Sequence, residues 1–256
     1  MLESCSEKFL NKLFELKKKY GFKIIFDEVF TGFFKSKEMF YFQNFNNIKP
    51  DVLCLSKTLG GGKSSISCLI VDDITYKNAY GNLNDTFLHT TTYNGFGEES
   101  ITALEAINIL SEESFKNKVE DLSNLLSNKL KSIEMKHKEK IDKIKGTGIL
   151  NGIVFKSFST SLANIVEKIP LQFINEKNFF LKKLTAVAVS CELYEKYNIL
   201  TSINDSVNSN HLSVSPALIV DHKSVDYFFN SLDSVLKEGV GVKSFEVILN
   251  FLKSRV

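Results

Sequence analysis

The sequence predicts a mixed α/β fold, with a mostly parallel sheet and helices in its first part and a small α+β part at its end. Three observations predict it. Segments with helical spacing of apolar residues alternate with short apolar runs over residues 1–140. Those runs show no polar alternation, which is typical of strands buried on both faces of a parallel sheet. Beyond residue 140 the apolar runs alternate more with polar residues.

The first part opens with a helix and a strand. Residues 6–20 place apolar side chains at helical spacing, and Gly21 ends that helix. Residues 22–29 form a continuous apolar run that ends in two carboxylates. The other expected elements of this part are two apolar strands and two helices, at 51–56, 66–71, 97–114 and about 115–139.

The second part is expected to alternate strands and helices. Its elements are a strand at 149–156, a strand followed by a helix within 186–200, a strand at 211–220 and a closing helix at 222–239. The stretch 202–213 is rich in Asn and Ser, which indicates a loop. The sequence therefore predicts one domain over 1–140 and a small domain over 141–256.

The composition is ordinary for a globular protein and excludes several functional classes. The chain is 43% hydrophobic and 24% charged. Its formal net charge of +2 gives no broad attraction to nucleic acid or to an anionic membrane. No apolar run reaches membrane-spanning length, and the N-terminus has no signal-peptide core. We therefore expect neither nucleic acid nor membrane as a partner.

The cysteines show no metal-like spacing, so no metal site is expected. The expected free thiols, in a reducing and cytoplasmic compartment, are Cys5, Cys54, Cys68 and Cys191. Cys54 and Cys68 are expected to be buried because they lie within apolar strands.

The histidines are expected to have structural roles or to face water. His89 is expected to position the threonine loop beside it through a hydrogen bond. His137 and His222 are expected in solvent. His211 either touches a substrate or simply ends a loop.

The stretch DVLCLSKTLGGGKSS, residues 51–65, has two interpretations. It ends in Gly62-Lys63-Ser64, as a nucleotide phosphate loop does, but Lys57 replaces the first glycine of that motif. The alternative is a Schiff-base site, because Lys57 follows one apolar strand and Asp27 ends another. If those strands are parallel neighbours, their carboxyl ends share one crevice.

Schiff-base chemistry needs these residue types. A lysine amine condenses with an aldehyde and must sit where its neutral form is favoured. A carboxylate such as Asp27 keeps a pyridine nitrogen protonated, which makes the ring an electron sink. Val29 could pack on the flat ring, and Gly60–Gly62 supply a sharp turn. Spacing alone leaves open that Asp27 merely ends a strand and that Lys57 is a solvated loop lysine.

Several motifs together resemble one family. The segments IIFDEVFTGFFKSKEMFYF (24–42) and IKPDVLCLSKTLGGG (48–62) resemble the central motif of the class III (omega) aminotransferases, which are fold type I enzymes that use pyridoxal 5'-phosphate. HTTTYNG (89–95), IKGTGILNGIVF (144–155) and SVSPALIV (213–220) resemble further family segments, in family order. The resemblance implies transfer of an amino group between an amine or amino acid donor and a keto acid or aldehyde.

The resemblance also implies roles for single residues. Lys57 would be the Schiff-base lysine and would move a proton between the substrate and the cofactor. Asp27 would pair with the pyridinium nitrogen, and Val29 would support the ring. Thr91 and Thr92 match a segment that binds the phosphate of the neighbouring subunit's cofactor, which implies a homodimer.

Some positions depart from the family pattern. Phe30 replaces a glutamine that approaches the cofactor's phenolic oxygen, and a phenyl ring cannot donate that hydrogen bond. Ser213 replaces the arginine that receives a substrate carboxylate, and Lys145 replaces the small-domain arginine. The only arginine of the chain is Arg255. These departures favour a donor whose amino group is distant from a carboxylate.

The resemblance covers only the C-terminal portion of family chains. Family members carry a long N-terminal half that binds the cofactor phosphate within the subunit and stacks on the ring. We therefore expect weak cofactor binding by this chain alone and an exposed apolar sheet edge. The alternative to a homodimeric enzyme is a partner-dependent fragment that needs a separate N-terminal half. The aromatic stretch 30–45 is expected to be core plus dimer interface.

Overall fold

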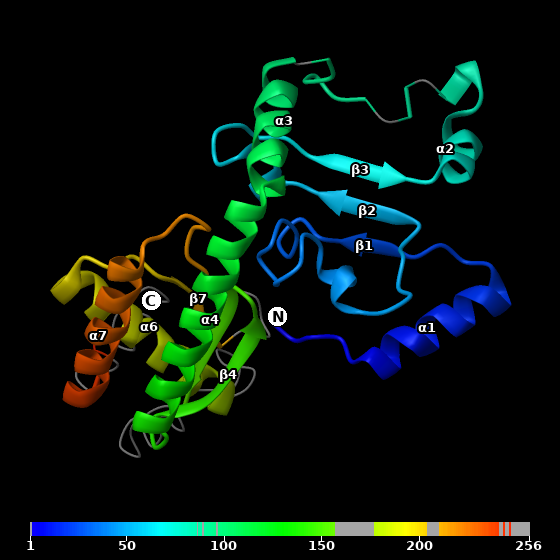
Figure 1. Ribbon diagram of the computed structural model, residues 1–256. Helices are drawn as coiled ribbons and strands as arrows, with labels where there is room; N and C mark the ends of the chain where they lie inside the picture. The colour runs from blue at the N-terminus through cyan, green and yellow to red at the C-terminus, as the bar shows by residue number, and fades with distance from the viewer. Residues whose placement is uncertain are drawn as a thin grey trace, which may run out of the picture. The chain divides into compact units, whose positions relative to one another are not determined.

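The computed structural model describes residues 2–85, 87–88, 90–95, 97–156, 177–203, 210–240, 243 and 246, and only the backbone of 177–181. The chain forms two compact units (Figure 1), one made of Cys5–Asp121 and the other of Met1–Ser4 with Leu122–Val256. The division falls within helix α4 (Glu113–Lys136). The expected domain boundary near residue 140 stays a prediction.

The unit Cys5–Asp121 contains a three-stranded sheet in the order β1-β2-β3. Strand β1 (Ile25–Asp27) is parallel to β2 (Val52–Leu55), as expected, because residues 28–51 are long enough for a crossover. Strand β3 (Cys68–Val71) is antiparallel to β2. The chain between β2 and β3 turns back through the 3-10 helix η2 (Lys57–Gly60) and Gly61. Strand β3 therefore runs back alongside β2.

Helix α1 (Glu7–Tyr20) has the ends that the sequence predicts. The hydroxyl of Ser6 accepts a hydrogen bond from the Phe9 N–H, and Gly21 closes the helix in the left-handed conformation, where φ is 73°. The helix lies beside β1 (Figure 1), and the Phe14 and Phe26 rings meet edge to face. Asp51 anchors this packing because it accepts from the Ile24 N–H and pairs with Lys17 at 2.7 Å.

The other helices of this unit include some that the sequence did not indicate. Helix α3 (Gly97–Ser111) and α4 match the two expected helices. Short helices outside the expectation are α2 (Asp73–Tyr80), η1 (Tyr41–Asn44) and η3 (Leu83–Asp85). Every helix among the described residues is too short or too polar to span a bilayer.

The expectation that the strands are buried on both faces is wrong for β1 and β3. Ile25 is 62% exposed, and Leu69 and Ile70 are 47% and 49% exposed. Cys68 is exposed and Cys54 only half-buried, so their expected burial is also not met, although all four cysteines are free. Apolar strands are covered only where other segments pack on them, and no described segment of this unit covers these side chains.

The aromatic loop after β1 is held by one buried carboxylate. Glu28 is buried and accepts from the backbone N–H groups of Tyr41 and Phe42 at 2.5 and 2.9 Å, and from the Thr31 hydroxyl at 3.2 Å. Burial raises the pKa of Glu28, although these hydrogen bonds oppose the rise. Phe33 and Phe34 are buried in this loop. The expected core role is confirmed for Phe33 and Phe34 but not for Phe30, which is 48% exposed; the interface role stays a prediction.

Replacing Lys37 by glycine is expected to raise the free energy of unfolding by up to about 1 kcal/mol. Lys37 is exposed and has a φ of 87°, in the region where a side chain crowds its own backbone. Urea titration followed by far-UV circular dichroism measures the change. Lys63→Gly is the matched control, because Lys63 lies in a turn without a positive φ, and it should give no gain. A loss of stability in Lys37→Gly would contradict the assignment of strain.

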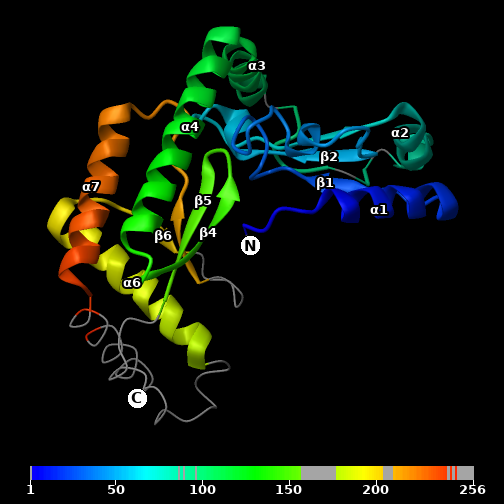
Figure 2. The ribbon, with the colours of Figure 1, turned by 60° about the horizontal axis from the view of Figure 1, so that its bottom comes forward.

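The second unit contains a four-stranded antiparallel sheet in the order β4-β5-β7-β6. Helices α6 and α7 contact each other, and α6 packs on β5 and β7 (Figure 2). The elements and bounds of this unit, besides α4, are β4 (Ile141–Thr147), β5 (Leu150–Phe155), α6 (Lys177–Tyr197), β6 (Ser202–Ile203), β7 (His211–Val214) and α7 (His222–Glu238).

Three expectations for this unit are corrected. The stretch 186–200 holds no strand, because 186–197 continue α6 and bury Ala186, Ala188 and Leu193 against the sheet. Strand β4 was not expected. The stretch 202–213 is not simply a loop, since it contains β6 and most of β7; residues 204–209 lie outside the described part.

The expectation that His137 faces solvent is also wrong. His137 is 4% exposed, and its Nε2 lies 2.7 Å from Oδ1 of Asp233 in α7. Lys136 and Lys237 pair with the same carboxylate at 2.7 and 2.8 Å. Burial raises the pKa of Asp233, but the hydrogen bonds from Lys136, Lys237 and His137 outweigh it and hold the pKa well below its ordinary value.

The Asp233 cluster predicts an acid-sensitive second unit. Because the folded-state pKa is depressed, the carboxylate's stabilising effect is complete above about pH 4 and is lost as the pH falls through the folded-state pKa. Asp233→Asn is expected to lower the free energy of unfolding near pH 7. It should also make that free energy fall less steeply than in the wild type as the pH becomes acidic. Urea midpoints measured across the acid range test this. Asp121→Asn, an exposed position in α4, should keep the wild-type profile; identical acid profiles for Asp233→Asn and wild type would contradict the assignment.

Candidate functional site

Asp27 and Lys57 come to the same edge of the sheet. Asp27 ends β1 and lies opposite Cys54 of the parallel strand β2. Lys57 begins η2 directly after β2. Parallel pairing therefore places both residues at the carboxyl ends of neighbouring strands, as the Schiff-base interpretation requires.

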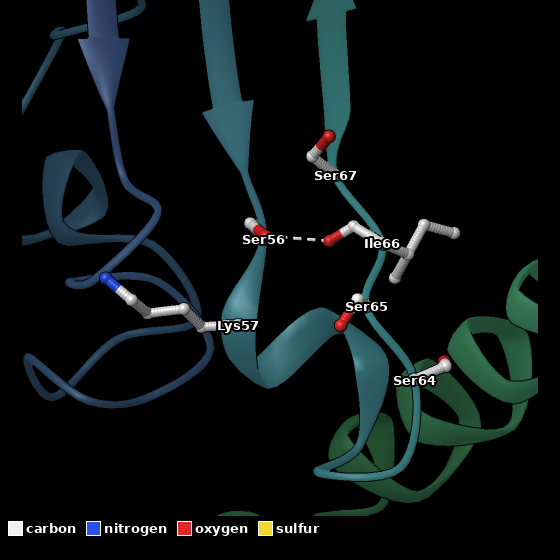
Figure 3. Close-up of a pocket in the computed structure, with 6 residues that line it drawn as sticks. All are labelled: Ser56, Lys57, Ser64, Ser65, Ile66 and Ser67. Carbon is white, nitrogen blue, oxygen red and sulfur yellow. Dashed lines mark hydrogen bonds between the residues drawn. The ribbon is translucent and has the colours of Figure 1, made fainter. Parts of the chain in front are cut away.

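A cavity of about 360 Å³ opens at this edge and is lined by Ser56, Lys57, Ser64, Ser65, Ile66 and Ser67 (Figure 3). The Ser56 hydroxyl donates to the Ile66 carbonyl at 2.7 Å and ties the end of β2 to the segment before β3. Asp27, Val29 and the threonines are not among the lining residues. The segment after Gly62 leads into strand β3, whereas a phosphate loop leads into a helix, so the fold does not favour the nucleotide interpretation.

The backbone of Lys57 is strained and the lysine amine is directed away from the serines. Its φ is 49°, in the left-handed region, which costs a non-glycine residue about 1–2 kcal/mol. Hydrogen bonds within η2 hold it there, from the Leu59 N–H to the Ser56 carbonyl and from the Gly61 N–H to the Thr58 carbonyl. Figure 3 shows the Lys57 side chain extending toward the loop that follows β1. Such strain is concentrated at functional positions.

The amine of Lys57 lies over an aromatic ring. Its Nζ is 4.8 Å from the centroid of Phe30, which is within range of a cation–π contact. Among the described residues, Lys57 forms no ion pair and no hydrogen bond through its amine. Sequence reasoning noted Phe30 as a departure from the family pattern and as part of the aromatic stretch 30–45, and missed this contact.

Asp27 is exposed, and its carboxylate forms a hydrogen bond within the turn that follows β1. Its Oδ1 accepts a hydrogen bond from the Val29 N–H at 3.0 Å, which shapes the turn that carries Val29 and Phe30. The Gly32 N–H donates a hydrogen bond to the Glu28 carbonyl at 3.0 Å, which closes this turn. Burial, and then the nearby charge of Asp27, raise the pKa of the Cys54 thiol. Sequence reasoning noted Glu28 only as one of two carboxylates at a strand end and missed its role as the buried acceptor that holds the aromatic loop.

The threonine segment lies in an exposed turn before α3. The Thr91 hydroxyl accepts from the Tyr93 N–H at 3.1 Å, and both Thr91 and Thr92 are exposed. Neither threonine bonds to Asp27 or Lys57 within the described part of the unit. His89, expected to position this loop, lies outside the described residues.

Lys145 and Ser213, which depart from the family pattern, both lie in the second unit. Together with Gly152 between them they form one row across β4, β5 and β7. Lys145 is ion-paired with Glu3, which comes from the N-terminal segment of the same unit. His211 is buried and is the first residue of β7. Burial and then the charge of Lys145 lower its pKa. No group of three or more metal-ligating side chains comes together over the described ranges.

Comparison with solved structures shows the same fold in known transaminases. The structure of a transaminase from the marine bacterium Virgibacillus matches 94% of this chain with a TM-score of 0.73 and 21% identity. Plasmodium falciparum ornithine delta-aminotransferase matches 91% with a TM-score of 0.68 and 20% identity. An (S)-enantioselective omega-transaminase from Thermomicrobium roseum matches 91% with a TM-score of 0.70 and 19% identity.

The match is partial on the side of these proteins. The chain covers 50%, 51% and 47% of their respective lengths, so it spans about half of each. At these identities the likeness shows the fold and nothing finer. A family model described as aminotransferase class III matches residues 3–236, which is most of the sequence. The chain therefore belongs to the class III aminotransferase family.

Proposed function

We propose that this chain provides the lysine-bearing part of a pyridoxal 5'-phosphate-dependent aminotransferase, with Lys57 as the Schiff-base lysine. The observation that carries the proposal is the parallel pairing of β1 and β2, which brings Asp27 and Lys57 to one edge. Family membership supports the cofactor, because class III aminotransferases use pyridoxal 5'-phosphate. The reaction would transfer an amino group between an amine or amino acid and a keto acid or aldehyde.

The residues at this edge fit the cofactor's chemical needs. The amine of Lys57 has no ion-pair partner among the described residues, so no carboxylate must be displaced before it reacts. Gly61 and Gly62 have positive φ values of 60° and 74°, and the space around Gly62 is open, which permits close approach of a flat ring. When bound, the cofactor supplies an electron sink for the substrate's bonding electrons. In the proposal, Asp27 holds a proton on the ring nitrogen, Val29 packs on the ring, and Lys57 moves a proton at the substrate carbon.

The donor class follows from the second unit. Ser213 occupies the position at which the family carries a carboxylate-binding arginine, and no arginine lies among the described residues. A hydroxyl cannot make a bidentate contact with a carboxylate. We therefore favour small-molecule donors with a terminal amine, such as diamines, over α-amino acids.

A donor half-reaction tests the proposed function. Purified protein is incubated with pyridoxal 5'-phosphate, and donors are added singly while absorbance reports loss of the lysine-bound cofactor. Conversion with a terminal diamine at a higher rate than with an α-amino acid supports both the reaction and the donor class. Binding without conversion by any amine would contradict an aminotransferase role for the chain alone.

The exposed strand residues favour a second candidate, a chain that functions with a partner. Ile25, Leu69 and Ile70 are about half exposed or more on a sheet whose edge strands are β1 and β3. Such an edge can accept a further strand from another chain. The partner in this proposal is either a second copy, with Thr91 and Thr92 reaching its cofactor phosphate, or a complementary N-terminal half. Sedimentation of the purified chain, with and without cofactor, separates a homodimer from a monomer that needs the other half.

The proposed location is the cytoplasm. The four free cysteines support it, because reduced thiols are typical of a reducing compartment. Immunolocalisation or fractionation of the native protein tests this location.

A further inference from the structure

We propose that Phe30 is a positioning residue that holds the amine of Lys57 over its ring before the cofactor arrives and thereby slows the capture of pyridoxal 5'-phosphate. The inference rests on the proposed function of Lys57. It concerns a contact between two side chains of this chain, the Lys57 Nζ and the Phe30 ring, which lie 4.8 Å apart.

Both partners of this contact are held by their backbones. Lys57 starts η2, and the hydrogen bond from the Ser56 hydroxyl to the Ile66 carbonyl fixes the residue before it. On the other side, the Asp27 carboxylate and the Glu28 carbonyl accept hydrogen bonds that shape the turn carrying Phe30. The side chain of Lys57 leaves its strained backbone in the direction of that turn (Figure 3). The contact therefore follows from two ordered segments.

The ring is the one group that holds the amine within the described part of the chain. Phe30 is 48% exposed and makes no ring contact with another described aromatic side chain. Its exposed face is therefore available to the lysine. A cation over an exposed aromatic ring is favoured by about two- to five-fold over the free cation. A glutamine at position 30, as in the family pattern, has no aromatic face and cannot hold the amine in this way.

The held amine must leave the ring before it reacts. In the capture step the neutral amine adds to the aldehyde carbon, a carbon–nitrogen double bond forms, and the aldehyde oxygen leaves as water with the two amine protons. The ring attracts the protonated amine and not the neutral one. Removing the ring is therefore expected to raise the rate of capture by about two- to five-fold.

A time course of covalent labelling tests the proposal. Full-length protein is mixed with pyridoxal 5'-phosphate, samples are reduced with borohydride at intervals, and mass spectrometry of peptides measures labelling of Lys57 and Lys63 in the same sample. Phe30→Leu should accelerate labelling of Lys57 and leave that of the exposed Lys63 unchanged. Phe30→Tyr keeps the aromatic face, so Lys57 should be labelled at the wild-type rate in this variant. Phe30→Trp presents a ring that attracts a cation more strongly, so it should slow the labelling of Lys57 below the wild-type rate.

The outcomes separate this inference from the proposed function. If wild-type protein shows no faster labelling at Lys57 than at Lys63, the proposed function fails. If Lys57 is labelled selectively but at one rate in the Leu, Tyr, Trp and wild-type proteins, the role of Phe30 is overturned while the lysine assignment stands. Pyridoxal, which lacks the phosphate, is the second probe. With pyridoxal, the rates of Lys57 labelling in the variants should stand in the same ratio to the wild-type rate. A difference between variants that appears only with the phosphorylated aldehyde would also overturn the inference.

Discussion

Replacing Lys57 by arginine is expected to abolish capture of pyridoxal 5'-phosphate at this position and to reduce amino transfer by about 10²- to 10⁴-fold, the range for removing a proton-transferring side chain. A guanidinium group is protonated throughout the working pH range and cannot add to an aldehyde. Arginine keeps the positive charge and much of the length of lysine. A loss therefore reports on amine chemistry rather than on charge.

The matched control for this experiment is Lys63→Arg. Lys63 follows the glycine turn on the same segment, is exposed, and is the lysine that the phosphate-loop interpretation would use. The expected result is loss of the lysine-bound absorbance in Lys57→Arg and its retention in Lys63→Arg. Lys57→Ala should behave as Lys57→Arg. Retained absorbance in either Lys57 variant would show that another amine holds the cofactor.

Replacing Gly146 by alanine is expected to destabilise the second unit by about 3 kcal/mol or more, the sum of a dihedral cost and a steric cost. Gly146 has a φ of 102°, and a Cβ atom there would lie 2.0 Å from the Leu150 carbonyl oxygen and 2.9 Å from the Asn151 Cα. These are backbone atoms, so no side-chain rotation can relieve the clash. The β4–β5 hairpin would have to open and expose the buried Ile149 and Ile153.

Amide hydrogen exchange measured by mass spectrometry can assign this loss to the second unit. Gly146→Ala is expected to increase exchange in β4, β5 and β7 and to leave β1 and β2 unchanged. Gly21→Ala is the control, because Gly21 has a φ of 73° but open space around the new Cβ. It should cost only the dihedral penalty of about 1–2 kcal/mol. Equal losses in the two variants would show that the clash at Gly146 is relieved.

Part of the fold could be predicted because its signals are local. Ser6 and Gly21 mark the ends of α1, and the apolar runs before Asp27 and Lys57 mark β1 and β2. The parallel pairing of these strands was a conditional prediction, and the structure confirms it. The stretch 186–200 misled the prediction because a helix buried on most sides loses its polar face, so its short apolar run resembles a strand.

The direction of β3 and the burial of the histidines could not be predicted. Strand β3 is apolar and short in either direction, and only the way the chain turns through Gly61 makes it antiparallel. His137 is buried because Asp233, almost a hundred positions later, arrives beside it from α7. His211 is buried because β7 pairs with β5, where Gly152 leaves room for the imidazole.

The sequence by itself determined the family motif, the identity of the reactive lysine candidate and most helix and strand positions, because residue spacing and local periodicity carry that information. Only the tertiary structure decided that Lys57 lies over Phe30, that Glu28 holds the aromatic loop, and that the apolar strands β1 and β3 remain exposed. The physical reason is that contacts between segments depend on how separate elements pack, and no local pattern specifies which side chain from elsewhere in the chain will meet a given residue.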